Sequence, residues 1–252
     1  MVDTHAHLFK NDYSCDELKE VLKKMSNNII IVSGTNYFDN LEVLELVKKY
    51  PNIYGTLGVH PTEENVDLEK CFELIEDNIS NEKIIGIGEI GLDYHYDVDK
   101  DYQKDLFIKQ IELANKYNKV MVIHSRDCIN ETYEILKKYK NKSVKFVMHC
   151  FSSSCEMAHK FIEMNGMLGI GGVVTYKNSR ILKDVVEKID LKYLLLETDS
   201  PYLTPVPFRG TKNEPYNIIY VAEEIAKIKN ITVDEVKSVT TANAYSQFDL
   251  VL

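Results

Sequence analysis

Short apolar runs alternate with longer amphipathic stretches along the whole chain, and this alternation limits the fold more than any other feature. It is typical of a parallel sheet whose strands are joined by crossover helices. The runs predict eight strands, at Met1–Asp3, Ile29–Ser33, Tyr54–Val59, Ile84–Glu89, Val120–His124, Lys145–His149, Met167–Gly171 and Tyr193–Glu197. Eight such units in 252 residues predict an α/β fold, a closed (β/α)8 TIM barrel, with residues 1–252 as one domain.

Helical patterns fill most of the intervals between these runs. They predict helices at Asp16–Ser26, Asn40–Lys49, Asp67–Asn78, Tyr102–Tyr117 and Arg180–Lys188, then near Ile218–Lys229 and Thr232–Thr240. Thr232 followed by Glu235 has the spacing of a capping box, and Asp16 is expected to cap the first helix. No linker, low-complexity tract or internal repeat divides the chain, which agrees with a single barrel.

The side chains that follow the predicted strands are unusually rich in groups that bind metals. In a barrel of this kind the active site lies at the carboxyl ends of the strands, because the loops converge there. Five of the seven histidines fall at such ends, together with three carboxylates: His5, His7, His60, Glu89, His124, His149, Glu197 and Asp199. On a strand, residues two apart share a face, so the rings of His5 and His7 would point to one partner.

We expect that partner to be a metal ion, and the number of ligands indicates two ions. The predicted ligands are His5, His7, Glu89, His124, His149 and Asp199. One ion cannot use all of them and keep an open position, whereas two ions can, with Glu89 as the shared ligand. Imidazole and carboxylate suit Zn, Mn, Fe or Co, and Mg prefers oxygen.

Other residues near these strand ends allow simpler interpretations. His60 alone fits either a packed side chain or a residue that supports the ligands or binds phosphate. His159 is expected on a solvated helix face, and His95 follows the GLDY turn without an assigned role. Cys150 is expected to point away from the site because His149 precedes it on a strand. Tyr94 and Tyr202 are expected to pack in the core unless a nucleobase stacks on them.

The charge balance limits how the chain can bind nucleic acid. A net charge of -9 argues against a wide basic surface that grips duplex DNA through many phosphates, so any such substrate must be held locally at the metal site. Only three arginines occur, at positions 126, 180 and 209.

The sequence also predicts a cytoplasmic location. It has no apolar run long enough for a membrane span and no secretory pattern, and five cysteines without CxxC spacing indicate reduced thiols.

Seven segments together resemble the TatD family of metal-dependent deoxyribonucleases, in the amidohydrolase superfamily. They are VDTHAHLF, GVHP, IGIGEIGLDY, IHSRD, HCFS, GIGGVVTYKNS and LLLETDSPYLTP, in order from residue 3 to about residue 215. The resemblance implies that His5 and His7 bind one ion, that Glu89 bridges, that His124 and His149 hold the second ion and that Asp199 completes the first site. It also implies that Arg126, Arg209, His60 and Glu197 contact substrate or support the ligands. Asn243 is the expected counterpart of a family asparagine.

The resemblance implies removal of nucleotides from DNA ends, 3′ to 5′, with a preference for single strands. It also implies that divalent metal is required and that Mg often supports turnover, so the two expected ions stay open between Mg, Mn and Zn. Our hypothesis is that two ions activate a water that attacks phosphorus, with Asp199 as general base and Glu89 and His60 as further catalytic residues. Arg126, Arg209 or His60 would offset phosphate charge. One alternative is an amidohydrolase or esterase that acts on a small or tRNA-linked carbonyl substrate, such as a D-aminoacyl-tRNA deacylase. Another is a degenerate barrel that binds metal or nucleic acid without catalysing a reaction. A monomer or weak oligomer is expected.

Overall fold

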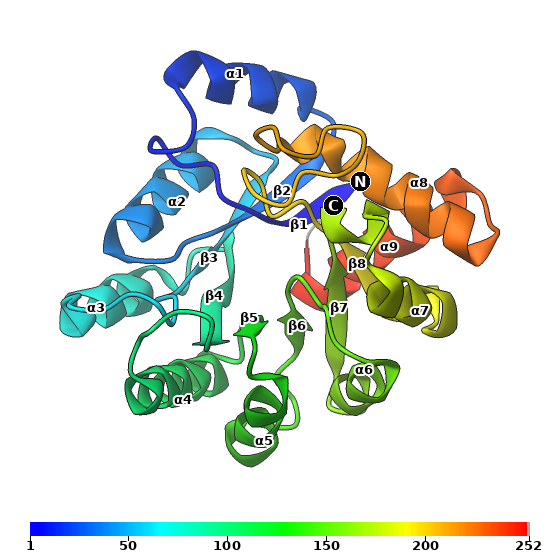
Figure 1. The fold of residues 1–252 in the computed structure, drawn as a ribbon. Helices are drawn as coiled ribbons and strands as arrows, with labels where there is room; N and C mark the ends of the chain where they lie inside the picture. The colour runs from blue at the N-terminus through cyan, green and yellow to red at the C-terminus, as the bar shows by residue number, and fades with distance from the viewer. Residues whose placement is uncertain (251–252) are drawn as a thin grey trace.

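Eight parallel strands form one sheet whose neighbours follow the order of the chain, from β1 to β8. The computed structural model describes residues 1–250, so the last two residues of the predicted domain lie outside this range. The strands are β1 (Val2–Ala6), β2 (Ile29–Ser33), β3 (Ile53–Leu57), β4 (Ile84–Asp93), β5 (Val120–Arg126), β6 (Phe146–Met148), β7 (Gly166–Ile170) and β8 (Leu194–Leu196). Figure 1 shows them curling into a nearly closed barrel inside a ring of helices, which confirms the predicted (β/α)8 architecture.

The barrel closes between β1 and β8 through contacts at the ends of these two strands. The amide N–H of His7 donates to the carbonyl of Ser200 at 2.7 Å, and the amide N–H of Asp199 donates to the carbonyl of His5 at 2.9 Å. Deeper in the barrel, the hydroxyl of Thr198 donates to the buried carboxylate of Asp3 at 2.6 Å. These bonds place Asp199 directly beside the two histidines of the first strand.

Seven of the helices within residues 1–250 overlap the predicted ranges, with differences at their ends, whereas those at Ile129–Tyr139 and Cys155–Ile162 were not predicted. The helices are α1 (Cys15–Lys24), α2 (Tyr37–Lys49), α3 (Leu68–Asn78), α4 (Lys100–Tyr117), α5 (Ile129–Tyr139), α6 (Cys155–Ile162), α7 (Arg180–Lys188), α8 (Ile218–Lys229) and α9 (Val233–Phe248). The prediction that Asp16 caps α1 is wrong. Ser14 is the N-cap and forms a capping box with Glu17, which leaves Asp16 in the first turn. Thr232 caps α9 as predicted, by accepting from the N–H of Glu235.

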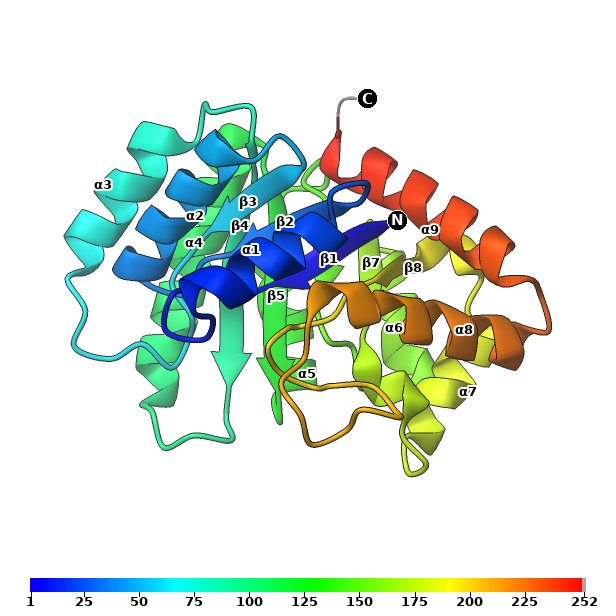
Figure 2. The ribbon, with the colours of Figure 1, turned by 90° about the horizontal axis from the view of Figure 1, so that it is seen from above.

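Two apolar layers hold the barrel together. The larger one joins the outer face of the sheet to the surrounding helices. The smaller one brings Val2, Val122 and Leu195, from β1, β5 and β8, against Phe248 near the end of α9. Figure 2 shows α9 lying across the end of the barrel opposite the strand arrowheads. One end is thus closed by apolar side chains of α9, and the other remains open.

Three buried amide side chains fix the open end. Asn40 of α2 bonds both backbone groups of Gly58, with contacts of 3.1 and 2.9 Å. Gln110 of α4 does the same for Val59, at 2.8 and 2.9 Å, and Gln103 for Asp93, also at 2.8 and 2.9 Å. Such pairs satisfy strand ends that would otherwise have unpaired polar groups. They hold the loops after β3 and β4 in register with their helices. Among residues 1–250, no helix is both long and apolar enough to cross a bilayer.

Candidate metal centre

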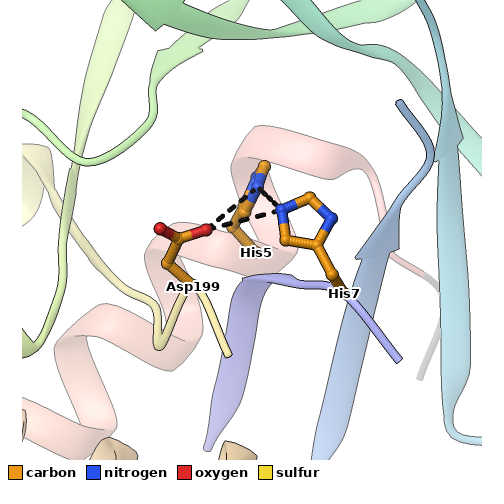
Figure 3. Close-up of side chains that lie close together, drawn as sticks. All are labelled: His5, His7 and Asp199. Carbon is orange, nitrogen blue, oxygen red and sulfur yellow. Dashed lines mark hydrogen bonds and ion pairs between the residues drawn. The ribbon is translucent and has the colours of Figure 1, made fainter. Parts of the chain in front are cut away.

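Three side chains from the first and last strands meet at the open end of the barrel. The Nε2 atoms of His5 and His7 lie 3.1 Å apart, and Oδ1 of Asp199 lies 3.7 and 3.4 Å from them. Figure 3 shows all three pointing to a common position. His5 and His7 are buried. The backbone of Asp199 is in the left-handed conformation, with φ of 54°. These atoms form one of the groups whose spacing suits a single ion.

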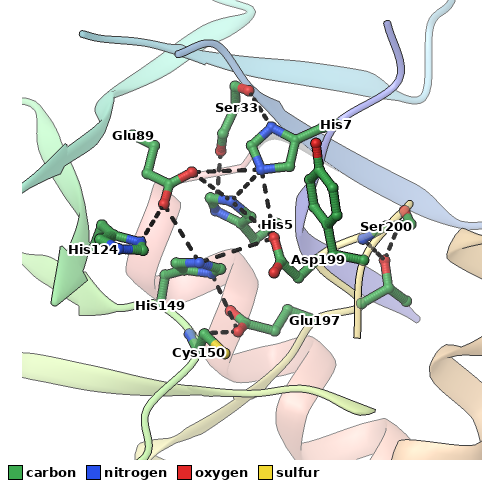
Figure 4. Close-up of polar contacts among 12 residues, drawn as sticks. His5, His7, Ser33, Glu89, His124, His149, Cys150, Glu197, Asp199 and Ser200 are labelled. Carbon is green, nitrogen blue, oxygen red and sulfur yellow. Dashed lines mark hydrogen bonds and ion pairs between the residues drawn. The ribbon is translucent and has the colours of Figure 1, made fainter. Parts of the chain in front are cut away.

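Glu89 connects this group to a second one through its two carboxylate oxygens. Its Oε2 lies 3.2 Å from Nε2 of His5 and 3.4 Å from Nε2 of His7. Its Oε1 lies 2.8 Å from Nδ1 of His124 and 3.5 Å from Nε2 of His149. Figure 4 shows the carboxylate between the two sets of rings, with the rings of His5 and His149 stacked at 3.7 Å. Oε2 therefore faces His5 and His7, and Oε1 faces His124 and His149.

Each of these four rings contacts a protein group with its outer nitrogen. Nδ1 of His7 donates to the carbonyl of Ser33 at 2.9 Å, and Nδ1 of His5 lies 3.2 Å from the hydroxyl of the same serine. Nε2 of His124 lies 2.9 Å from Oδ2 of Asp93. Nδ1 of His149 lies 3.3 Å from Oε1 of Glu197. Outer contacts of this kind turn the other nitrogen toward the centre, as in metal sites with oriented histidine ligands.

The centre is electrostatically coupled in a way that suits a cation. Burial alone would raise the pKa of Glu89, but His149 and His5 outweigh burial and hold that pKa well below its usual range. Burial would lower the pKa of His7, yet bonds to Asp199 and Glu89 raise it to about 10. Without an ion, protons on the rings balance the buried carboxylates. A divalent cation can take their place because imidazole nitrogen and carboxylate oxygen are its ligands.

The centre lies at the bottom of a cavity of about 810 Å³. The loops after most of the strands line this cavity. Asp12 and Asp39 come from one side, Tyr96 and Arg126 from the other, and Tyr202 from the loop after β8. The cavity has room for a nucleotide-sized ligand above the metal ligands.

Known proteins are similar to this chain in sequence and in fold. A family model described as TatD related DNase matches residues 2–249. This chain belongs to the TatD family. The metal-dependent hydrolase YabD of Bacillus subtilis is 41% identical over 252 residues, which cover 98% of both chains. The metal-dependent hydrolase MJ1582 of Methanocaldococcus jannaschii is 39% identical, covering 98% of this chain and 96% of its own. The solved structure of YJJV, a TatD homolog of Escherichia coli, has a TM-score of 0.89 at 29% identity, covering 100% and 98% of the two chains.

The family and the ligand geometry together identify a metal-dependent hydrolase, and the structure places the other predicted residues around it. His60 lies 3.7 Å from Oε1 of Glu89, and burial lowers its pKa to about 4, so the ring is neutral at pH 7. Its Nδ1 contacts the hydroxyl of Thr62 at 2.7 Å. Arg126 lines the cavity of the TatD-family site. Arg209 does not line it and lies over the ring of Tyr176 at 4.3 Å.

Of the two roles expected for Glu197, contact with substrate or support of the ligands, its buried position fits support of the ligands. Its side chain is fully buried and accepts the amide N–H of Cys150 at 2.6 Å. It fits only because Gly169 has no side chain, since a Cβ there would lie 2.1 Å from Oε2 of Glu197. In this TatD-family chain Glu197 therefore lies beneath His149, out of reach of a substrate. Asn243 is likewise structural, because its amide donates to the carbonyls of Leu191 and Leu194.

Two further predictions about individual side chains need correction. The strand β6 ends at Met148, and Cys150 takes a left-handed conformation with φ of 46°, so it lines the cavity instead of packing away from it. Tyr202 is 55% exposed and also lines the cavity, which excludes core packing. Tyr94 is packed as predicted, with its hydroxyl donating to Glu131 at 2.5 Å. His159 is exposed on α6 as expected.

Two residues that contact the ligands were not predicted. Asp93 is buried, and with His60 and His124 it forms a further group whose atoms lie close enough to hold an ion. Ser33 ends β2 and contacts both His5 and His7. Asp93 lies within the GEIGLDY segment, so its carboxylate four residues after Glu89 is a signal that could have been used. Ser33 has no such signal.

Proposed function

We propose that this TatD-family protein is a deoxyribonuclease that removes nucleotides from DNA ends, 3′ to 5′ and from single strands. The observation that supports this most directly is the placement of Glu89, with one oxygen toward His5 and His7 and the other toward His124 and His149. This arrangement fits two ions that share one carboxylate, a pattern used for phosphodiester hydrolysis. The DNase description of the matching family supports DNA as the substrate.

The predicted ligands would each bind one or both ions. His5, His7 and Asp199 would hold one ion, His124 and His149 a second, and Glu89 both. When bound, the ions supply Lewis acidity that activates water and offsets phosphate charge. Burial alone would raise the pKa of Asp199, but His149 and His7 lower it, so the carboxylate is ionised and able to accept a proton from water.

Two side chains above the centre would contact the phosphate. Arg126 presents a guanidinium that is always charged and suits phosphate oxygens. His60 is neutral at pH 7, so it would act by hydrogen bonding and not by charge. Arg209 lies against Tyr176 in this structure, which makes it a weaker candidate for the same role.

The test combines metal content with substrate choice. Purified protein should contain two divalent ions per chain and release nucleotides from single-stranded DNA labelled at either end, with loss of activity in EDTA and recovery with Mg²⁺ or Mn²⁺. D-Aminoacyl-tRNA and simple esters at the same metal concentration test the carbonyl alternative. Hydrolysis of these esters with DNA left intact would replace the nuclease assignment.

A variant of the proposed base sharpens the test. Asp199→Asn should keep the backbone bond to His5 and lose roughly 100-fold or more of the DNA hydrolysis rate. Asp77→Asn is the matched control, because Asp77 is exposed at the carboxyl end of α3, far from the cavity lining. Wild-type turnover in Asp199→Asn would contradict the role given to this carboxylate.

A further inference from the structure

Charge is divided unevenly between the two halves of the cavity. Asp12, Asp39 and Glu63 line the half formed by the loop after β1, the first turn of α2 and the loop after β3. Arg126, at the end of β5, is the only Lys or Arg among the described residues that line the cavity. We call the first side, with Asp12, Asp39 and Glu63, the carboxylate half, and the second, with Tyr96 and Arg126, the arginine half. The metal ligands lie between them.

The carboxylate half keeps its charges close together, and Lys212 reaches it only at the backbone, where Nζ donates to the carbonyl of Asp12 at 3.0 Å. The amide of Asn36 donates to Oδ2 of Asp39 at 3.2 Å and to Oε1 of Glu63 at 3.5 Å, so one side chain joins both acids. No ion pair within 4.0 Å links Asp12, Asp39 or Glu63 to a Lys or Arg in residues 1–250. Burial raises the pKa of Glu63, and the nearby charge of Asp39 adds to this shift. Because no Lys or Arg side chain among residues 1–250 pairs with these carboxylates, this wall of the cavity carries a net negative charge.

The arginine half offers the opposite chemistry. The guanidinium of Arg126 lies 5.7 Å from the ring centre of Tyr96, and the hydroxyl-bearing residue Ser152 also lines the cavity. Tyr96 is 55% exposed. A cation, hydroxyl donors and an exposed aromatic ring are the groups that bind a phosphate and its nucleobase in single-stranded DNA.

A strand cut at the metal centre has a nucleoside on each side of the scissile phosphate. The two halves of the cavity offer different binding groups to these two nucleosides. A second phosphate in the carboxylate half would meet uncompensated negative charges, which disfavours it. A terminal nucleoside brings no phosphate, and its hydroxyl and amino groups can donate to carboxylate oxygens. The next phosphate of the strand suits the arginine half.

We infer that Asp12, Asp39 and Glu63 restrict this site to strand ends, by accepting a terminal nucleoside with a free hydroxyl and excluding a further phosphate, while the strand leaves past Arg126. The inference rests on the proposed function and deepens it. It explains exonuclease action by the charge of the cavity walls and not by a steric block. It also assigns Asp12, Asp39 and Glu63 as residues that determine specificity.

The first test measures binding, so it does not depend on catalysis. Protein loaded with Mn²⁺ is titrated with deoxyadenosine 5′-monophosphate and with deoxyadenosine 3′,5′-bisphosphate by calorimetry. The bisphosphate should bind about tenfold or more weakly at low salt, despite its greater charge, and the difference should shrink as salt screens the repulsion. Equal or tighter binding of the bisphosphate would overturn the inference.

Variants locate the effect. The double variant Asp39→Asn with Glu63→Gln should reduce the preference for the monophosphate over the bisphosphate to about threefold or less. The control variant Asp77→Asn with Glu82→Gln removes the same charge from exposed positions away from the cavity. It should leave that preference unchanged. Asp12→Asn alone should give an intermediate ratio. Within residues 1–250 the bond from Lys212 goes to the backbone carbonyl of Asp12, so this change of side chain removes no bond that holds the loop. An unchanged ratio in both cavity variants would contradict the assignment.

Cleavage of two oligonucleotides separates this inference from the proposed function. The wild-type enzyme should degrade a strand with a 3′-hydroxyl at least tenfold faster than the same strand with a 3′-phosphate, and the double variant should approach equal rates. Hydrolysis of both strands at equal rates by the wild type contradicts the charge argument and leaves the nuclease intact. A binding preference without any release of nucleotide contradicts the nuclease assignment and supports the selectivity of the cavity.

Discussion

Oδ2 of Asp93 lies 2.9 Å from Nε2 of His124, and this contact fixes the histidine ring while its other nitrogen faces Glu89 at 2.8 Å. Burial would raise the pKa of Asp93, but the His124 ring lowers it, so the carboxylate is ionised. A carboxylate in this position orients a histidine ligand and makes it more basic.

Replacing Asp93 with asparagine should therefore weaken metal binding without unfolding the protein. We expect an affinity loss of about 10- to 100-fold for one ion, because a neutral amide orients the ring less firmly. Competition with a coloured chelator measures this change. Asp97→Asn, at an exposed position on the same loop, is the control. Unchanged affinity for both ions in Asp93→Asn would remove Asp93 from the metal centre.

Glu89→Gln should reduce the number of ions bound per chain from two to at most one. The amide keeps the shape of the side chain, yet it cannot give an anionic oxygen to both groups of histidines. Elemental analysis of dialysed protein counts the ions. Glu64→Gln changes an exposed glutamate near the mouth and should retain two. Two tightly held ions in Glu89→Gln would show that Glu89 is not shared.

Metal affinity should rise with pH across the neutral range. The pKa of His7 is raised to about 10 and that of His149 to about 9 in the protein without metal, so below pH 9 both rings are mainly protonated. An ion must displace these protons, and its apparent affinity should fall as the pH decreases. Calorimetry in two buffers with different ionisation enthalpies measures the release. Metal binding without proton release at pH 7 would contradict this expectation.

Gln103→Leu should destabilise the fold by about 3 kcal/mol. Leucine fills similar space, but the buried N–H and carbonyl of Asp93 would lose both partners. Urea unfolding measures the change in the free energy of unfolding. Lys109→Leu introduces the same residue at an exposed position of α4 and should change stability by less than about 0.5 kcal/mol. Equal stability of the two variants would contradict the role of the amide pair.

The barrel and the meeting of the ligands were predictable because topology alone brings strand ends to one rim. Each apolar run marks a strand, and the next polar residue must then lie at the open end whatever its distance along the chain. This reasoning needs no side-chain geometry, so it placed His5, Glu89 and Asp199 together although they lie far apart in the sequence.

The misses occur where a single residue changes the direction of the backbone. Gly91, with φ of 143°, let β4 continue to Asp93, although a glycine at that point resembles the start of a turn. A Cβ at Gly91 would lie 2.0 Å from the carbonyl oxygen of His124, so only glycine allows this approach. Cys150 turned toward the cavity through a left-handed conformation that a residue-by-residue strand pattern does not contain. Ser33 contacts two ligands, but a serine at a strand end looks the same with or without such contacts.

Because the barrel closes between β1 and β8, the ions would also stabilise this closure. An ion bound by both His5 and Asp199 would be a cross-link between residues nearly a whole chain length apart. Closing so large a loop is entropically costly for an unfolded polypeptide, and a cross-link at its ends reduces that cost. Loss of the ions would therefore loosen the junction of the first and last strands before the rest of the sheet. Chelation would then lower the stability of the barrel as well as inhibit the enzyme.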